Sequence, residues 1–219
     1  MLIQVEQGSR EWFEARKGRL TASVAASAAG LKGAYLSRAA CWKTYMGEER
    51  PTNEAMLYGS EHEEVARDAG ERAVGSLSYP VGIHVSDNHD WISSSTDGVF
   101  HKMGLHEIKC RPTQPYEEIS PQHMAQIQVQ LECAGYERCY FQSWTPDQQR
   151  IWIVPRSKDY FKWLLPHLEE FWKYIITREE PPRLPKRRRY PQELPHNIIY
   201  EGNSQLPHNI IYEGNSHGI

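Results

Sequence analysis

Two carboxylates and a lysine fall within one short stretch, residues 95–110, which reads STDGVFHKMGLHEIKC. Asp97 opens a turn early in this stretch, and Glu107 and Lys109 follow in a short apolar run. Because successive side chains of a strand point to opposite faces, Glu107 and Lys109 are predicted to share one face while Ile108 points into the core. A carboxylate and a lysine on one face, close to a second carboxylate, indicate a site where these charges act together in a reaction.

This combination is typical of a metal site for phosphodiester hydrolysis. Mg²⁺ prefers hard oxygen ligands and needs few of them from the protein. We therefore expect Asp97 and Glu107 to share the ion, with the backbone carbonyl of Ile108 as a further ligand. Lys109 would stand beside the attacking water, and a second Mg²⁺ about 4 Å away would stabilise the leaving oxygen. Mn²⁺ accepts the same ligands and would substitute. The alternative is a solvated hairpin with an ordinary Glu-x-Lys pair.

Polar residues in two neighbouring segments add to this pattern. Upstream, YGSEHEEVA supplies Glu61, Glu63 and Glu64, and a helix carrying one of them over the site would give a third carboxylate. Downstream, Gln126 and Gln130 are one helical turn apart on one face, beside an apolar stripe. Glutamines on a helix are usually solvated unless a phosphate lies nearby.

Arg16 and Ser23 suggest a site for an anion near the N-terminus. A guanidinium can make two charge-assisted bonds to a phosphate. A serine that opens a helix adds a hydroxyl, backbone N–H groups and the positive end of the helix dipole. The alternative is a helix-capping serine with a surface arginine, and the two roles can coexist.

The composition favours one soluble, mid-sized α/β domain. A chain of 219 residues, 39% of them hydrophobic, can bury a core without disulfides. No apolar run approaches the roughly 20 residues of a membrane span, and the N-terminus carries charges where a signal peptide would be apolar. We therefore expect a cytoplasmic protein without a membrane partner. The net charge of −3 argues against a simple basic nucleic-acid binder.

The four cysteines show no C-x-x-C pair and are expected to be buried free thiols, with an iron–sulfur cluster as the alternative.

Periodicity and turn signals predict helices first and a sheet later. Helical patterns cover residues 9–18, 21–30, 36–47 and 53–75, the last interrupted at Gly59. Strand patterns cover 78–86, 90–100 and 104–111, followed by a helix at 120–135, strands at 138–144 and 149–155, and a helix at 157–177. We expect a single domain over residues 1–178, with a helical N-terminal part at about 9–75, a sheet core at about 79–155 and a closing helix at about 157–177.

After Thr177 the composition changes to REEPPRLPKRRRYPQELPHN, which is too rich in proline and charge for packed structure. Residues 179–219 are therefore predicted to be a Pro-rich, basic C-terminal tail. It contains an 11-residue direct repeat, LPHNIIYEGNS, at 194–204 and 206–216, to which no function is attached.

Four segments, in their order along the chain, resemble one known family. SREWFEARKGRLTAS, YGSEHEEVA, STDG…HEIKC and HMAQIQVQLECAG look like the motifs of the phage lambda exonuclease or YqaJ-type viral recombinase nucleases, a branch of the PD-(D/E)XK phosphodiesterases. The resemblance runs from about Ser9 to Pro155. It implies a restriction-endonuclease-like α/β core, in which a central mixed β-sheet is flanked by helices.

Transferred residue by residue, the resemblance gives roles to the candidate catalytic residues. It implies that Asp97 and Glu107 hold the metal and that Lys109 orients the water. Glu63 matches the helical acid near the metal ions, and Gln126 matches the active-site glutamine.

The resemblance also gives roles to residues outside that cluster. Arg16 and Ser23 match a family pocket for the terminal 5′-phosphate of DNA. Asp87 matches an outer acid ahead of the metal aspartate. Thr96 departs from the family, which commonly has proline there, and this position shapes the turn before Asp97.

The function that the resemblance implies is a metal-dependent 5′-to-3′ exonuclease. It would degrade one strand of double-stranded DNA from its ends, to give 5′-mononucleotides and a 3′ single-stranded tail for phage-type homologous recombination. A homotrimeric ring that threads DNA and a single-strand annealing protein as partner are also implied. Two alternatives stay open: a structure- or sequence-specific endonuclease or resolvase on the same core, which would gain nothing from a 5′-phosphate pocket, and a non-catalytic DNA-end-binding protein.

Overall fold

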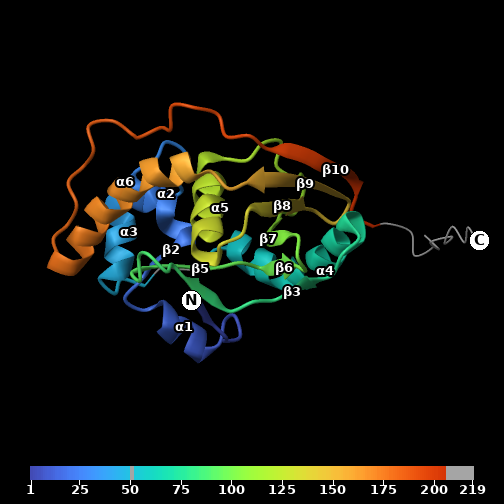
Figure 1. Ribbon diagram of the computed structural model, residues 1–219, viewed down its shortest axis with the longest axis horizontal. Coiled ribbons are helices and arrows are strands. Elements are labelled where there is room, and N and C mark those ends of the chain that lie inside the picture. Colours follow the sequence, from blue (N-terminus) through green and yellow to red (C-terminus); the bar gives the residue numbers. More distant parts are fainter. Residues whose placement is uncertain (50–51, 206–219) are drawn as a thin grey trace, which may run out of the picture.

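A computed structural model describes residues 1–49 and 52–205 of the chain (Figure 1). The helices are α1 (Arg10–Arg16), the 3₁₀ turn η1 (Ala22–Val24), α2 (Ala25–Ala29), α3 (Arg38–Tyr45), α4 (Glu54–Val74), α5 (Pro121–Ala134) and α6 (Lys158–Thr177). The strands are β1 (Leu2–Ile3), β2 (Leu20–Thr21), β3 (Ser78–Tyr79), β4 (Ile83–Val85), β5 (Ile92–Ser95), β6 (Gly98–Phe100), β7 (Gly104–Cys110), β8 (Arg138–Trp144), β9 (Gln148–Pro155) and β10 (Asn197–Asn203).

The strands form two sheets. The smaller has the order β1-β4-β5-β2 and the larger the order β10-β9-β8-β7-β6-β3. In the larger sheet β7 and β8 are parallel, whereas their other neighbours pair antiparallel. A parallel pair needs a crossover connection, and α5 provides it. The predicted mixed α/β architecture is therefore confirmed.

Two of the predicted strands are each divided between the two sheets. The strand expected at 78–86 forms β3 and β4, because Pro80 has no N–H to continue a ladder. The strand expected at 90–100 forms β5 and β6, and the chain changes sheets between Ser95 and Gly98. At this crossing the backbone of Gly98 lies so close to Ser78 that a Cβ would be 2.2 Å from its Oγ. Asp97 therefore stands where the two sheets meet.

The long N-terminal helix is continuous, in contrast to the expected interruption at Gly59. α4 begins after Asn53, whose side chain accepts a hydrogen bond from the Met56 N–H at 2.9 Å, and ends at Gly75 with φ 73°. A single helical glycine costs only about 1 kcal/mol, which the rest of a 21-residue helix tolerates. Throughout the described part of the chain, the helices are each too short or too polar to cross a lipid bilayer.

The larger sheet lies between α5 and α4. On one face Leu105 and Phe141 pack against Ile127 of α5. On the other face Ile108 packs against Ala66 of α4. The strand β7 is thus covered on both faces, and side chains from both helices can reach it.

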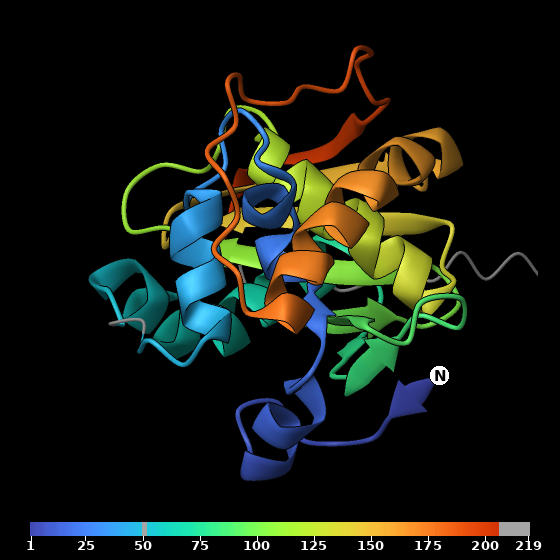
Figure 2. The same ribbon diagram turned by 90° about the vertical axis from the view of Figure 1, so that its left-hand side faces the viewer.

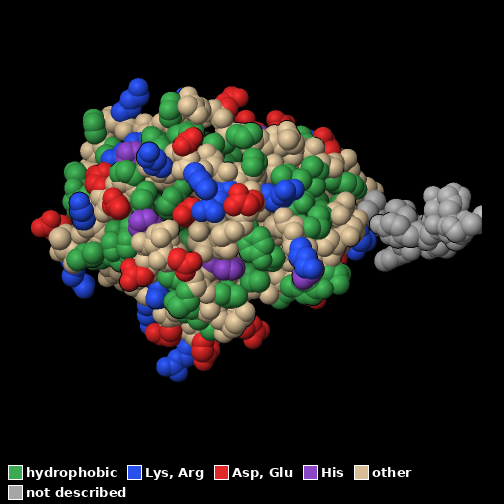
Figure 3. All heavy atoms as spheres, viewed as in Figure 1, with side chains coloured by type: hydrophobic (Ala, Val, Ile, Leu, Met, Phe, Trp, Pro, Cys, Tyr) green, Lys and Arg blue, Asp and Glu red, His purple; other side chains and the backbone are tan. Residues whose placement is uncertain are grey.

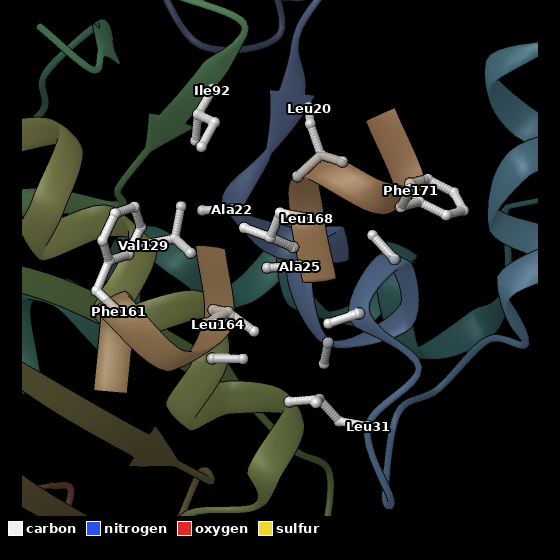
Figure 4. Close-up of a cluster of buried hydrophobic side chains, with 14 of the residues drawn as sticks. Leu20, Ala22, Ala25, Leu31, Ile92, Val129, Phe161, Leu164, Leu168 and Phe171 are labelled. Atoms are coloured by element: carbon white, nitrogen blue, oxygen red, sulfur yellow. The ribbon is translucent and has the colours of Figure 1, made fainter. Parts of the chain in front are cut away.

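The closing helix α6 completes the core beside α5. Leu164, Leu168 and Phe171 of α6 are fully buried in a cluster with Ala25 of α2 and Val129 of α5 (Figures 1 and 4). The four cysteines form no disulfide, and Cys133 and Cys139 are buried. This packing holds α5 firmly, which matters because α5 faces the candidate site.

Side chains of residues 179–205 are mostly exposed, but this segment makes specific contacts with the domain that the expectation of an unpacked tail did not include. It runs along the outside of the domain from the end of α6 to β10 (Figures 1 and 2). The Arg188 N–H donates to the Gly30 carbonyl at 3.1 Å, and the Arg188 side chain pairs with Glu170 at 2.5 Å.

The first repeat copy contains β10, which pairs with the edge strand β9. These contacts lie far apart in sequence, so composition alone could not predict them. The second copy lies outside the described residues, and the domain limits remain a prediction.

Candidate active site

The structure brings Asp97, which directly precedes β6, next to Glu107 on the neighbouring strand β7. β6 and β7 are antiparallel, with Gly98 opposite His106, so Asp97 comes next to Glu107 in the register. The Asp97 Oδ2 atom accepts a hydrogen bond from the Ile108 N–H at 2.5 Å. This bond fixes the Asp97 carboxylate onto β7 at the position between Glu107 and Lys109.

Glu107 is buried, with 1% of its surface exposed, and is surrounded by donors. Its Oε1 accepts from Lys109 Nζ and from Gln126 Nε2, the latter at 2.5 Å, and its Oε2 accepts from Gln130 Nε2 at 2.6 Å. Glu107 and Lys109 therefore share the face of β7 that is turned to α5, whereas Ile108 packs on α4, as the alternation predicted. The two glutamines are one turn apart on α5, and each donates a hydrogen bond to a different oxygen of the same carboxylate.

Glu63 is the acid of α4 that reaches the cluster. Its Oε1 accepts from the Arg67 guanidinium at 2.7 Å, and the same guanidinium donates to the Asp97 carbonyl. Glu63 is half-buried, whereas Glu61 and Glu64 are exposed. Of the three upstream acids, the structure thus selects the one that the family resemblance implies.

Burial and mutual repulsion perturb the ionisation of these groups. Burial, reinforced by the charge of Asp97, raises the pKa of Glu107 to about 7 and that of Glu63 to about 7 as well. Burial alone would lower the pKa of Lys109, but Glu107 and Asp97 raise it above its ordinary value. Lys109 therefore stays protonated and acts as a fixed positive charge.

The donor set fits a hard divalent cation, although it is not arranged as a closed cage. Among the described residues, no three His, Cys, Asp or Glu side chains converge on one point. These carboxylates do not converge because Glu107 bonds to the glutamines of α5 and Glu63 bonds to Arg67. Mg²⁺ commonly takes only one or two carboxylates and keeps several waters. Asp97 and Glu107 meet that need, and a cation would counter both the burial and the Asp97 charge that raise the pKa of Glu107.

Arg16 supplies a second charged feature beside β5. Its guanidinium donates to the Ser95 Oγ at 3.0 Å and lies over the Trp12 ring, 4.0 Å from the centroid. Burial lowers the pKa of Arg16. No acidic side chain pairs with it in the described part of the chain. The charge of this half-buried guanidinium is therefore not neutralised by an ion pair, which suits it to bind an anion.

Ser23 lies at the same end of the small sheet as Ser95. β2 pairs in parallel with β5, Thr21 opposite Ser93, so the chain continues toward Ser23 in the direction in which β5 continues toward Ser95. Ser23 is exposed, and its carbonyl accepts from Gln122 Nε2 at 2.8 Å. The helix expected from residue 21 begins as the turn η1, and α2 starts only at Ala25, so Ser23 does not cap it.

Asp87 does not join the cluster. It follows β4, and in the β4–β5 hairpin Val85 pairs with Ser93 whereas Ile83 pairs with Ser95. Asp87 therefore lies at the end of the hairpin opposite to Asp97. Its exposed carboxylate binds the N-terminal amine at 2.6 Å.

A buried polar network that sequence reasoning missed fixes α4 onto the sheet. His106 Nε2 lies 2.8 Å from Gln142 Oε1, and Gln142 Nε2 donates to the Ala66 carbonyl at 2.8 Å. Gln149 Nε2 donates to the Ala69 carbonyl at 3.1 Å. Burial lowers the pKa of His106 to about 3, so the imidazole is neutral. The only signal in the sequence was the presence of glutamines within apolar strands.

Two further site residues were missed or only half recognised. Ser95 is the hydroxyl partner of Arg16, and only its place two residues before Asp97 in a run of serines pointed to it. Gln130 was recognised by its helical spacing from Gln126, but without a role. The structure places both at the centre of the site.

An acid at a sheet crossing, a Glu-x-Lys strand beside it and helices on both faces define a nuclease of the PD-(D/E)XK type. The chain matches the crystal structure of an alkaline exonuclease (LHK-Exo) from Laribacter hongkongensis at a TM-score of 0.65 and 26% identity, over 78% of this chain and 94% of that chain. The same enzyme in complex with dAMP matches at a TM-score of 0.65 and 25% identity, with the same coverage.

The family model of the YqaJ-like viral recombinase domain matches residues 11–137. Comparison with curated protein sequences gave no match. The chain therefore belongs to the YqaJ-like viral recombinase family and is a nuclease of the lambda exonuclease type.

Proposed function

We propose that this chain is a metal-dependent exonuclease that degrades one strand of double-stranded DNA from its 5′ end. The products would be 5′-mononucleotides and a 3′ single-stranded tail. One observation carries the proposal: Ser95, whose hydroxyl accepts a hydrogen bond from the Arg16 guanidinium, is only two residues from Asp97. An anion pocket and a catalytic carboxylate therefore adjoin on one segment of chain.

This adjacency suits removal of one nucleotide at a time from an end. A terminal 5′-phosphate on Arg16, with Ser23 at the same end of the small sheet, would leave the next phosphate of the strand near Asp97 and Glu107. An internal phosphodiester offers less charge and more bulk than a terminal phosphate, so the pocket favours ends. The complex of the related enzyme with dAMP, a mononucleotide, supports this product.

The roles of the cluster follow from its contacts. Asp97, Glu107 and the Ile108 carbonyl would hold Mg²⁺, which supplies Lewis-acid stabilisation of a phosphoryl oxygen when bound. Lys109 keeps its proton at Nζ and places a fixed positive charge where negative charge develops. Gln126 orients Glu107 by its bond to Oε1.

Glu63 adds a third carboxylate at the edge of the cluster. Together with Asp97 it would hold a second Mg²⁺, or Mn²⁺ in its place. After burial, the charge of Asp97 is the main cause that raises the pKa of Glu63, which supports this assignment.

The biological setting is proposed to be phage-type recombination in the cytoplasm of a bacterial or phage-infected cell. The family to which the chain belongs is named for viral recombinases, and a 3′ tail is the substrate that a single-strand annealing protein would take. A homotrimeric ring around the DNA is proposed as the working assembly. Basic and acidic side chains are interspersed on the face shown in Figure 3, which gives no continuous basic surface there to hold DNA. A ring that encloses the DNA would not depend on such a surface.

Digestion of a linear duplex labelled at the 5′ or the 3′ end, set beside a closed circle, tests the proposal. We expect 5′ label to appear first as a mononucleotide, 3′ label to stay in long single strands, and the circle to survive. Cleavage of the circle would identify an endonuclease or resolvase on the same core. Binding of ends without degradation in Mg²⁺ or Mn²⁺ would identify a non-catalytic end-binding protein.

A further inference from the structure

Gln130 touches both halves of the proposed site. Its side chain is fully buried on α5. Its Nε2 donates to the Glu107 Oε2 at 2.6 Å and to the Ser95 carbonyl at 3.1 Å. Glu107 lies on β7 of the larger sheet and Ser95 on β5 of the smaller sheet, so one amide group bridges the two sheets where the site is built.

The orientation of this amide is determined by its neighbours. A carboxylate and a carbonyl can only accept hydrogen bonds, so the amino group must face both of them. Within the described residues no donor reaches the buried Gln130 Oε1 atom. Both hydrogens of the amino group are therefore committed, one to each half of the site.

A continuous series of hydrogen bonds results. The Arg16 guanidinium donates to the Ser95 Oγ, and the carbonyl of the same Ser95 accepts from Gln130, which also holds Glu107. A phosphate that shifts Arg16 would shift Ser95, and Gln130 would pass this shift to the Glu107 carboxylate.

We propose that Gln130 is a positioning residue that couples occupation of the terminal-phosphate pocket to the orientation of Glu107. The inference rests on the proposed function, because it assigns the Arg16 pocket to the 5′-phosphate. Gln126, although it lies on the same face of α5, donates only to the Glu107 Oε1 atom among the described residues and makes no bond to β5. The coupling is therefore specific to Gln130.

Gln130→Met tests this, since methionine nearly fills the same volume and donates no hydrogen bond. Gln128→Met is the matched control, because Gln128 is also buried on α5 but its amide bonds the Pro155 carbonyl and the Ser157 N–H, away from the site. The full-length protein is assayed for kcat and KM on 5′-phosphorylated and 5′-hydroxyl duplexes.

We expect the wild-type protein and Gln128→Met to prefer the phosphorylated end by the same ratio of kcat. In Gln130→Met this ratio should fall about tenfold, the effect of losing one hydrogen bond to a charged group. In an Arg16→Ala background Gln130→Met should change this ratio no further, because the hydrogen bond from Arg16 to Ser95, which begins the series, is already lost.

Equal loss of rate on both substrates would overturn the coupling, since it would mean that Gln130 only holds Glu107. An unchanged ratio in Gln130→Met would overturn it as well. A wild-type protein that degrades ends without preferring the phosphate would instead refute the pocket assignment on which the proposed function rests.

Discussion

The Ile108 N–H donates to the Asp97 Oδ2 at 2.5 Å, and this bond fixes the crossing between the two sheets onto β7. Asp97 ends the passage from β5 to β6, whereas Ile108 is in the middle of β7. The backbone of β7 thus positions the carboxylate of Asp97, which directly precedes β6. The main chain fixes Asp97 in this way, whereas Glu107 is turned to α5 and Glu63 to Arg67, so these two side chains would have to leave their present partners to bind a cation.

Removal of either central carboxylate should stop cleavage and spare binding of DNA ends. Asp97→Ala and Glu107→Ala each lose a proposed metal ligand, which is worth several kcal/mol of transition-state stabilisation, so turnover in Mg²⁺ should fall by ~10³-fold or more. Fluorescence anisotropy with a labelled duplex should show retained end binding, because Arg16 is untouched. Near-normal turnover by either variant would remove the proposed site.

Lys109→Ala should slow cleavage severely. Lys109 Nζ is held by Glu107, and Arg67, the other cation near the cluster, is engaged with Glu63 and the Asp97 carbonyl. We expect a loss of about 10²–10³-fold in kcat with little change in KM, since a fixed charge acts mainly on the developing charge. Full restoration of the rate by Mn²⁺ would show that the lysine is dispensable.

Arg16→Ala should blunt the preference for phosphorylated ends. The variant loses the guanidinium beside Ser95 but no residue of the acidic cluster, so the rate on 5′-hydroxyl ends should change least. The ratio of initial rates on the two ends should fall roughly tenfold or more. Lys17→Ala is a matched control, because Lys17 is basic and adjacent but exposed and paired with Glu14. A wild-type ratio in Arg16→Ala would place the pocket elsewhere.

Gly70→Ala should destabilise the protein and disturb α4. A Cβ at this position would lie 2.6 Å from Gln142 Oε1 and 3.0 Å from His106 Cε1, within the network that fixes the helix on the sheet. We expect a loss of roughly 1–3 kcal/mol and a lower Tm. Gly59→Ala is the control in the same helix, where a Cβ meets nothing within 4 Å, and it should raise stability by about 0.5–1 kcal/mol. Equal Tm values for the two variants would contradict the packing of α4 described here.

Local pattern predicted much of this site because its main residues are close in sequence. The alternation along β7 placed Glu107 and Lys109 on one face, and the Ser120 cap and helical spacing predicted α5 with both glutamines on one side. The roles of Glu63 and Arg16 came from the ordered motifs of the family. The structure shows both near the cluster.

The features that sequence could not predict depend on distant contacts. The turn signal at Asp97 and Gly98 predicted a break in the strand, but nothing in this polar run indicates that the chain passes from one sheet to the other there. Asp87 aligned with a family acid, but the hairpin register places it away from Asp97. The contacts of residues 179–205 with the domain include backbone bonds to Gly30 and pairing with the edge strand β9, and nothing in the sequence of the tail itself indicates either partner.

The assembly that would keep this nuclease on DNA can also be tested. A protein with a net charge of −3 and interspersed surface charges should make few salt-sensitive phosphate contacts and release DNA quickly. A closed ring of three copies would hold the strand topologically, so that release no longer depends on each contact. We therefore expect light scattering to give three times 25.4 kDa in solution.

Digestion should then continue over long runs after competitor DNA is added as a trap. Salt added after initiation should slow new starts more than continuing runs, because only capture depends on free phosphate contacts. Asp97→Ala serves as the control for assembly, since it should form the same trimer without cleaving. A monomer at working concentration together with immediate arrest by the trap would leave a distributive nuclease and exclude the ring.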